Sequence, residues 1–469
     1  MQRYHFLLPL VLCLATCGPA IDNRPNFVIF MPDDQSYETI GAYGNDWVQS
    51  PNLDRLAAEG IRFNRAFVTN SLCAPSRASV LTGLYSHTHG VATNRVTPPG
   101  SGPTGVTLSK EFVTFPEILQ DHGYETAFIG KIHVEPWLRD REFDYYFAFE
   151  DHGAYRNPKL AEVTNRVGPY EDVAYPGYLI DIITEHAVEY LKQDRDKPFC
   201  LLFWHKAPHS PLDPHARYRG MYGDHDFQPP ETWTDDYTGK PKVLRDREPV
   251  KDTPEARKAW GNGKRLYYQL LAGVDDSVGE VLNALDNLGI ADNTVVIHTS
   301  DNGMNMGHHG LADKRFMYEA SIRVPFIVRY PKLVTPNVDS DHMILNIDMA
   351  PTVLDMAGVS VPDFMHGRSI LPILKGEPVE WRKEWLYEYY EYPWWGEIPP
   401  FRGIRTDQYK YVFWYSRWPW ERELYDLHTD PNEMHNLAND PQYADLIEQL
   451  HERMQELRRE TNDPDIGKN

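Results

Sequence analysis

Short apolar runs alternate with helical patterns along most of this chain, and this alternation restricts the fold more than any other feature of the sequence. The runs have the length of buried β-strands and occupy residues 26–31, 126–129, 199–204, 294–299 and 325–329. Helices are predicted between them at 52–59, 115–122 and 266–288. Strands that alternate with helices favour an α/β fold in which a large, mostly parallel sheet is covered by helices on both sides.

The longest predicted helix carries its apolar residues on one face. Within 266–288 they recur every three or four positions, at Leu266, Leu270, Val274, Val278, Val281 and Leu285. The preceding segment, 213–264, is polar and contains several prolines and many charges. We therefore expect surface loops around a cleft in that segment.

From about residue 381 the chain becomes rich in aromatic residues and the alternation ends. Strands are predicted at 404–415 and 423–427, and a helix rich in Glu and Arg at 443–461. We expect a large domain over residues 24–380 and a smaller C-terminal α+β subdomain with an antiparallel sheet over 381–469.

The N-terminus has the pattern of a signal peptide over residues 1–20. Polar residues precede the apolar run 6–15, which is shorter than the roughly 20 residues that a membrane-spanning helix needs. The segment 14–17, Leu-Ala-Thr-Cys, resembles a bacterial lipobox, in which Cys17 would carry a lipid anchor. Ordinary cleavage near Ala20 is the alternative. Both interpretations predict export, to the periplasm or to the outer side of a bacterial membrane.

Charge and cysteine content narrow the functions further. A net charge of −21 argues against a general nucleic-acid binder, which needs a basic face. Two of the four cysteines lie in the leader, which leaves Cys73 and Cys200 for the body of the protein. They could form one disulfide in an exported protein. Cys200, however, lies in the apolar run 199–204 and is predicted to be a buried strand residue, so Cys73 requires its own explanation.

Acidic residues follow two of the predicted strands. Asp33 and Asp34 follow the run 26–31, and Asp301 and Asn302 follow the run 294–299. Because ligands collect beyond the carboxyl ends of parallel strands, these side chains are expected to lie close together. Carboxylates held close need a cation, and oxygen ligands suit Ca²⁺ or Mg²⁺ rather than zinc. The alternative is that each pair is only a turn or a helix cap.

The segment 73–77, Cys-Ala-Pro-Ser-Arg, predicts a helix N-terminus. Pro75 suits the first turn of a helix, where its missing N–H does no harm. Cys73 would then lie at the positive end of the helix, which favours an anion, and Arg77 would lie one turn further on the same face. A plain thiolate nucleophile would also be favoured at such a position.

The continuation of this segment resembles a known family. The pattern Cys-x-Pro-Ser-Arg-x-x-x-Leu-Thr-Gly at 73–83 is similar to the signature of the formylglycine-dependent sulfatases, which belong to the alkaline phosphatase-like superfamily. Further segments resemble the family in the same order, namely Gly-Lys-Ile-His at 130–133, Lys-Ala-Pro-His at 206–209, Ser-Asp-Asn-Gly at 300–303 and Asp-Lys-Arg at 313–315. The resemblance extends from residue 25 to about 438, and bacterial polysaccharide sulfatases look most similar.

This resemblance implies a site and a chemistry. Cys73 would be oxidised to formylglycine by a formylglycine-generating enzyme, and the domain at 24–380 would be catalytic. One Ca²⁺ ion, rather than Mg²⁺, would be held by Asp33, Asp34, Cys73 in its converted form, Asp301 and Asn302. Arg77, Lys131 and Lys314 would stabilise the transferring sulfuryl group of a sulfated carbohydrate. His209 would protonate the departing sugar oxygen, and His133 would take a proton as sulfate leaves.

Several alternatives remain open. A phosphodiesterase or phosphonate monoester hydrolase of the same superfamily would share the metal site, and an unconverted glycan-binding lipoprotein would keep its thiol. His205, His308 and His309 lie beside the expected site segments and compete for the same roles. The aromatic cluster at 389–395 would either stack on sugar rings or pack between the two domains.

Overall fold

The structure is a computed structural model that describes residues 23–95, 106–134, 143–149, 152–166, 171–392, 397–415 and 419–465. The predicted signal peptide and Cys17 lie outside these residues, so both stay predictions. None of the helices in the described ranges combines the length and the apolar composition that crossing a membrane requires.

A ten-stranded sheet forms the centre of the molecule. Its five middle strands, in the order β9-β1-β8-β4-β5, are parallel, and antiparallel pairs occur toward both edges. The strands in spatial order are β12 (Val338–Ser340), β2 (Ile61–Phe63), β11 (Ile327–Arg329), β9 (Thr294–His298), β1 (Asn26–Phe30), β8 (Phe199–Trp204), β4 (Glu125–Lys131), β5 (Tyr145–Phe149), β6 (Lys159–Thr164) and β7 (Asp172–Ala174). This confirms the predicted mixed, mostly parallel sheet.

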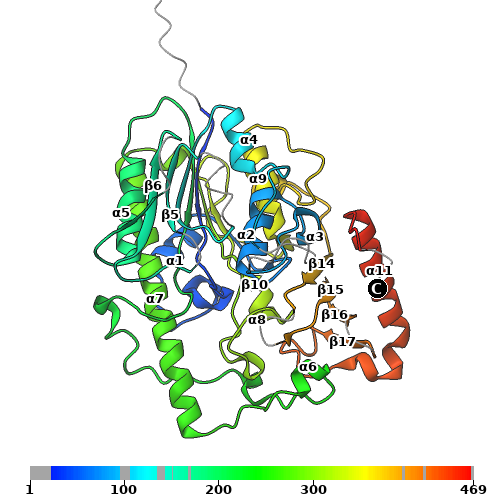
Figure 1. Ribbon diagram of the computed structural model, residues 1–469. Helices are drawn as coiled ribbons and strands as arrows, with labels where there is room; N and C mark the ends of the chain where they lie inside the picture. The colour runs from blue at the N-terminus through cyan, green and yellow to red at the C-terminus, as the bar shows by residue number, and fades with distance from the viewer. Residues whose placement is uncertain are drawn as a thin grey trace, which may run out of the picture.

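Helices cover both faces of this sheet (Figure 1). One face carries α1 (Pro51–Ala58), α5 (Leu179–Leu191) and α7 (Pro254–Asn287), and the other carries α2 (Cys73–Thr82), α4 (Phe115–Asp121) and α9 (Met349–Met356). Strand β1 contributes to both cores, because Phe27 and Ile29 point to one face and Val28 and Phe30 to the other. A strand buried on both faces must be apolar throughout, which explains the uninterrupted run in the sequence.

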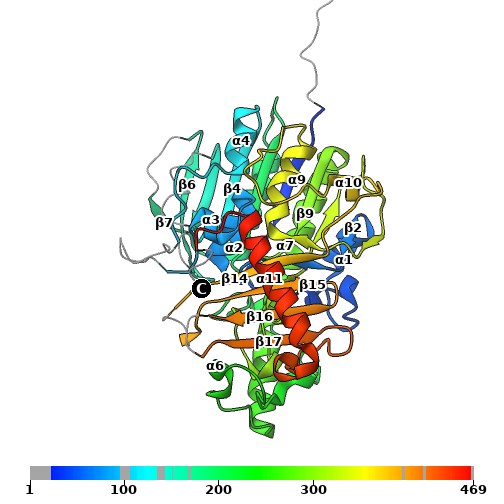
Figure 2. The ribbon, with the colours of Figure 1, turned by 90° about the vertical axis from the view of Figure 1, so that its right-hand side faces the viewer.

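The C-terminal region forms a separate antiparallel sheet of four strands, β14 (Glu384–Tyr389), β15 (Phe401–Thr406), β16 (Tyr409–Trp414) and β17 (Glu421–Asp426). Helix α11 (Ala444–Glu460) lies across one face of it (Figure 2). The other face shares a core with the large domain through residues such as Phe67 and Leu72. The predicted antiparallel C-terminal sheet is therefore confirmed, whereas the exact boundary at residue 381 stays a prediction.

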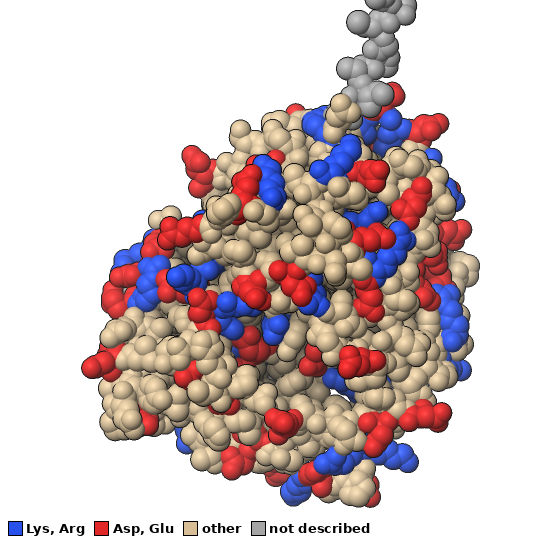
Figure 3. Space-filling view, turned by 180° about the vertical axis from the view of Figure 1, so that it is seen from behind, with Lys and Arg blue, Asp and Glu red and all other residues tan. Residues whose placement is uncertain are grey.

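The remaining elements are short and connect these layers. A three-stranded sheet has the order β10 (Arg323–Val324), β3 (Ala66–Phe67) and β13 (Ile344–Leu345). Among the residues that the structure describes, the other α-helices are α3 (Ser86–His89), α6 (Lys242–Arg245), α8 (Glu319–Ile322) and α10 (Leu371–Leu374). On the face drawn in Figure 3, basic and acidic side chains are interspersed, so that face offers no continuous basic surface to a nucleic acid.

Two predicted elements differ in the structure. Helix α7 begins at Pro254 rather than at residue 266, because Thr253 caps it by accepting a hydrogen bond from the Ala256 amide (3.2 Å) and Pro254 suits its first turn. Only residues 213–253 of the expected loop segment therefore precede the helix, and Leu266 is 36% exposed rather than part of the buried face. The single strand predicted at 404–415 is two strands, β15 and β16, joined by a tight turn.

Candidate active site

The acidic residues predicted from the sequence meet at the carboxyl ends of two neighbouring parallel strands. Asp33 and Asp34 follow β1, and Asp301 follows β9, which pairs with β1. The backbone amide of Asp34 donates to Oδ1 of Asp301 (3.0 Å), and carboxylate oxygens of all three residues lie within 4.8 Å of one another. All three side chains are buried. The strand order therefore produces the cluster that the sequence indicated.

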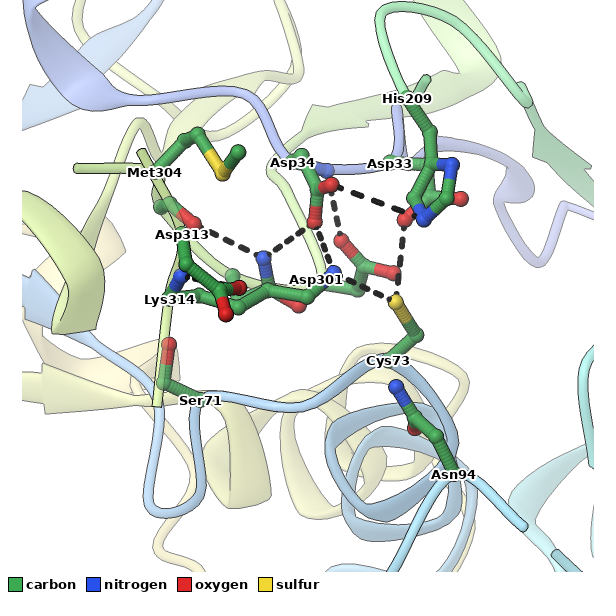
Figure 4. Close-up of polar contacts among 12 residues, drawn as sticks. Asp33, Asp34, Ser71, Cys73, Asn94, His209, Asp301, Met304, Asp313 and Lys314 are labelled. Atoms are coloured by element: carbon green, nitrogen blue, oxygen red, sulfur yellow. Dashed lines mark hydrogen bonds and ion pairs between the residues drawn. The ribbon is translucent and has the colours of Figure 1, made fainter. Parts of the chain in front are cut away.

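Cys73 is the first residue of α2 and faces this cluster (Figure 4). Its Sγ lies 3.2 Å from Oδ1 of Asp33 and accepts from Nζ of Lys314 at 2.9 Å. Burial, together with the negative charge of Asp33, raises the pKa of the Cys73 thiol. The surroundings therefore disfavour a plain thiolate nucleophile, although the helix N-terminus alone would favour one.

Three buried cations oppose the three carboxylates. Nε and Nη2 of Arg77 donate to Oδ2 of Asp301 at 3.0 and 2.8 Å, and Nη1 donates to the backbone oxygen of Lys131 at 2.5 Å. The ammonium groups of Lys131 and Lys314 pair with Asp33 and Asp34, respectively. Arg77 is fully buried. Each cation is therefore paired with one carboxylate, and the charged groups are held in fixed, buried positions.

Gly130, the first residue of the Gly-Lys-Ile-His segment, lies where two strands approach each other closely. Gly130 has φ 111°, and a Cβ there would lie 1.9 Å from the backbone oxygen of Trp204 in β8. Glycine therefore allows β4 to pack against β8 up to the point where Lys131 reaches Asp33. His133 follows at φ 52°, and no described residue bonds to its buried Nδ1. Burial, with the charge of Lys131, lowers the pKa of His133 well below its ordinary value.

His209 lies on the open side of the cluster. Its Nδ1 lies 2.7 Å from the backbone oxygen of Ser210 and therefore carries the proton of that hydrogen bond, which leaves Nε2 facing Oδ2 of Asp34 at 3.8 Å. Burial lowers the pKa of His209 to about 4. An anionic group bound beside the ring would favour the protonated form that a general acid needs.

The donor set fits a hard divalent cation. Asn302 donates from Nδ2 to Oδ1 of Asp34 (2.6 Å), while its buried Oδ1 has no partner in the described part of the chain. Burial and the charge of Asp33 raise the pKa of Asp301 to about 7, although the charge of Arg77 opposes the rise. Three carboxylates and an unpaired amide oxygen are ligands that Ca²⁺ accepts. The roles of these residues as ligands stay predictions.

A pocket of about 730 Å³ opens onto this cluster. It is lined by residues of several segments, namely Asp34, Asn94, Arg95, His152, His209, Ser210, Pro211, Arg247, Met304, Ala312, Asp313, Lys314, Arg315 and Glu391. Its volume lies within the range of about 300–1,000 Å³ that is usual for small-molecule sites.

Some residues of this site were not predicted. The ring of His152 lies 4.7 Å from that of His209 and 5.0 Å from that of His133, and its Nδ1 is 3.4 Å from Nζ of Lys131. The side chain of Asn94 accepts from the Ala74 amide at the start of α2 (2.9 Å). Neither residue belongs to a recognisable segment of the sequence, and only the packing of loops brings them to the site.

The competing histidines have other partners. Nε2 of His205 lies 3.0 Å from Oγ of Ser277, His309 pairs with Asp235 at 2.7 Å, and His308 lies 3.8 Å from Glu38. Cys200 is buried in β8 and both body cysteines are free thiols, as predicted for Cys200.

The aromatic cluster at 389–395 is divided between core and surface. Tyr389 is fully buried and stacks on Phe401, so it belongs to the core, whereas Tyr392 is 42% exposed. Trp394 and Trp395 lie outside the described residues, so the sugar-stacking alternative stays untested for them.

Comparison with known proteins gives two matching family models. Residues 25–359 match the model described as Sulfatase, and residues 307–460 match the model described as N-sulphoglucosamine sulphohydrolase, C-terminal. The chain is similar to an N-acetylglucosamine-6-O-sulfatase of Bacteroides thetaiotaomicron, with 35% identity over 98% of this chain and 92% of that protein. It is also similar to the human N-acetylglucosamine-6-sulfatase, with 33% identity over 82% of this chain and 71% of that protein.

Solved structures agree with these matches. A structure described as a complex with its substrate D-glucosamine-2-N,6-O-disulfate superposes with a TM-score of 0.85 at 33% identity, covering 94% of this chain and 99% of that one. A phosphonate monoester hydrolase of Agrobacterium radiobacter superposes with a TM-score of 0.72 at 23% identity, covering 93% of this chain and 96% of that one. The second similarity is one of fold alone.

Proposed function

Because the chain belongs to the sulfatase family, we propose that it hydrolyses a sulfate ester of a carbohydrate, with Cys73 converted to formylglycine and one Ca²⁺ ion beside it. The observation that carries this proposal is the position of Cys73, buried at the N-terminus of α2 between Asp33 and Lys314. A thiol whose pKa is raised in this way is a poor nucleophile, so conversion of the side chain gives the position a chemical purpose.

The names of similar proteins support a specific substrate class. Two similar proteins are named for N-acetylglucosamine-6-sulfate, and a similar structure is described with a 6-O-sulfated glucosamine. We therefore propose a glucosamine residue with a 6-O-sulfate, at the end of or within a sulfated oligosaccharide or polysaccharide. The pocket beside Cys73 is large enough for a sugar ring.

The residues of the site suit both a Ca²⁺ ion and a formylglycine at position 73. Asp33, Asp34, Asp301 and Asn302 would hold the ion together with an oxygen of the converted residue 73, and Ca²⁺ tolerates such an irregular oxygen set better than Mg²⁺ does. The bound ion would add positive charge beside the carboxylates and polarise the sulfate oxygens. The converted side chain would supply, once hydrated, the hydroxyl that attacks sulfur.

The buried cations would stabilise the transferring group. A sulfuryl group spreads negative charge over its oxygens as the ester bond breaks. Lys314, whose ammonium touches Sγ of Cys73, is placed nearest to that charge, while Arg77 and Lys131 balance the carboxylates behind it. Because these groups are already oriented and desolvated, they cost no reorganisation during the reaction.

Two histidines would move the protons. His209, at the pocket mouth, would donate a proton from Nε2 to the sugar oxygen as the S–O bond breaks. His133, on the deep side of the same cluster, has an unpartnered Nδ1 among the described residues and a low pKa, so it is a neutral ring able to accept a proton when sulfate leaves residue 73. Hydration of the aldehyde at residue 73 would take up one water. The two hydroxyls of the hydrate would then lose one proton each, the first on attack at sulfur and the second as the C–O bond to sulfate breaks, and the sugar oxygen would gain one, so one proton is released per ester hydrolysed.

Export completes the proposal. The leader at 1–20 would carry the chain to the periplasm or leave it tethered through Cys17, and a formylglycine-generating enzyme would act on the segment 73–83. A sulfated glycan outside the cell would then be within reach.

The direct test combines activity with the chemistry of residue 73. Protein from the native host should release sulfate from N-acetylglucosamine-6-sulfate, and mass spectrometry should show the peptide containing Cys73 as its aldehyde form. The Cys73→Ala variant should lose turnover, while Cys200→Ala, which alters a buried cysteine away from the site, should keep it. An unmodified thiol in an active enzyme would refute the formylglycine proposal. Faster turnover of an aryl phosphonate than of an aryl sulfate would favour the phosphonate hydrolase alternative.

A further inference from the structure

The pocket beside Cys73 contains a cation that the proposed reaction does not use. Four basic side chains line the pocket, namely Arg95, Arg247, Lys314 and Arg315. Lys314 is engaged by Asp34 and Cys73. Arg315 donates to Glu391 (2.9 Å) and to Asp313 (2.6 Å), and Arg95 also has a partner.

Arg247 differs from the other three. Its guanidinium lies over the ring of Phe316, 5.4 Å from the ring centroid, and no carboxylate in the described ranges pairs with it. Phe316 is buried, and Arg247 is partly buried. The aromatic face therefore supports one side of the guanidinium while its N–H groups keep their hydrogen-bonding capacity.

The surrounding charges leave this guanidinium available. The three carboxylates that line the pocket are already paired, Asp34 with Lys314, and Asp313 and Glu391 with Arg315. The planar fork of Arg matches two oxygens of a sulfate group, which is the chemistry that the pocket already handles.

We propose that Arg247 binds a second sulfate group of the substrate, next to the ester that is cleaved. This inference rests on the proposed function and goes beyond it, because it makes Arg247 a specificity-determining residue for glycans that carry more than one sulfate. Arg247 does not belong to the charged cluster around Cys73, where the ester would be cleaved. The second sulfate would therefore contribute to substrate binding rather than to bond breaking.

The test compares two substrates that share the 6-O-sulfate and differ at the glucosamine nitrogen, which carries an acetyl group in N-acetylglucosamine-6-sulfate and a second sulfate in D-glucosamine-2-N,6-O-disulfate. For the disulfate, Arg247→Ala should raise KM about tenfold or more with little change in kcat, the size expected for one charge-assisted pair that acts in binding. For the monosulfate the rise in KM should stay below about threefold. Arg247→Lys, which keeps the charge but loses the fork, should fall between.

Arg245→Ala is the matched control. Arg245 lies two residues away and pairs with Glu421 at 2.7 Å, outside the pocket, so its removal takes away the same charge without touching the site. It should leave the ratio of the two KM values unchanged. Thermal unfolding of each variant confirms that the comparison is made on folded protein.

The outcomes separate this inference from the function on which it rests. If the wild-type enzyme desulfates both sugars and Arg247→Ala changes both KM values by the same factor, or neither, Arg247 does not bind a second sulfate. If wild-type protein with a converted residue 73 desulfates neither sugar, the proposed substrate is wrong, and the assignment of Arg247 falls with it. A selective loss on the disulfate supports both.

Discussion

Lys131 offers a test of the charge balance at the site. We predict that Lys131→Met lowers the free energy of unfolding substantially when divalent cations are chelated. Methionine keeps the unbranched stem of lysine and its packing but removes the ammonium group that pairs with Asp33. Lys131 lies outside the segment 73–83, so conversion of Cys73 should be unaffected.

The size of the effect follows from the burial of Asp33. Both side chains are fully buried, and removing one partner of a buried ion pair typically costs about 3–5 kcal/mol. Nη2 of Arg77 remains 4.0 Å from Oδ1 of Asp33, which places the expected loss near the lower end, about 3 kcal/mol. Although burial opposes it, Lys131 and the other cations hold the pKa of Asp33 well below its ordinary value. The stability that Asp33 contributes is therefore present at neutral pH and lost only in acid.

Denaturant unfolding at pH 7 measures this loss, once with a chelator and once with saturating Ca²⁺. Calcium should narrow the difference between Lys131→Met and wild type, because the ion replaces the missing positive charge beside Asp33. The control Lys192→Met, which breaks an exposed pair with Glu189, should cost less than about 1 kcal/mol in both buffers. A loss that is the same with and without Ca²⁺ would refute the idea that Asp33 holds the ion.

Two further predictions concern a proton donor and a buried acid. His209→Ala should lower kcat on a sugar sulfate by about 10²–10⁴-fold but affect an aryl sulfate with a good leaving group far less, and equal losses on both substrates would remove the general-acid role. Asp275 accepts from the amides of Asn52 and Leu53 at the start of α1 (3.1 and 2.8 Å), and burial raises its pKa from 3.8 to about 6. An acid with a raised pKa stabilises the fold at low pH and loses that contribution as pH rises to about 6. Between pH 4 and pH 7, the free energy of unfolding of Asp275→Asn should therefore rise by about 2 kcal/mol relative to that of the wild type, whereas parallel pH profiles of the two proteins would contradict the raised pKa.

The central strands could be predicted from the sequence because burial on both faces leaves no freedom in their composition. Strands β1, β8 and β9 are buried at nearly every position, so each is an uninterrupted apolar run. The edge strand β7 is exposed along its length and pairs with a single neighbour, and nothing in its three residues distinguishes it from a loop. The start of α7 carried a usable signal in Thr253 and Pro254, but two glycines at 261 and 263 weaken the helical pattern that follows.

At the site, the charged cluster could be predicted from the sequence and the pocket wall could not. Charge balance explains why the cluster was predictable. Each predicted carboxylate of the cluster is neutralised by a predicted cation, Asp33 by Lys131, Asp34 by Lys314 and Asp301 by Arg77. Burying the carboxylates or the cations alone would be costly. The fold therefore brings the two sets together, although their residues are far apart in the chain and either follow buried strands or begin a buried helix.

The residues of the pocket wall are not constrained by charge balance in this way. Asn94, Arg247 and Glu391 lie on loops and follow no periodic pattern in the sequence, so only the folded structure shows that they line the pocket. Chemistry shared by the family is therefore readable from the sequence, whereas the choice among sulfated sugars depends on the loops. For that reason, a change in the substrate preference of the Arg247 variants is a sharper test of the role of the pocket than a change in their turnover rate.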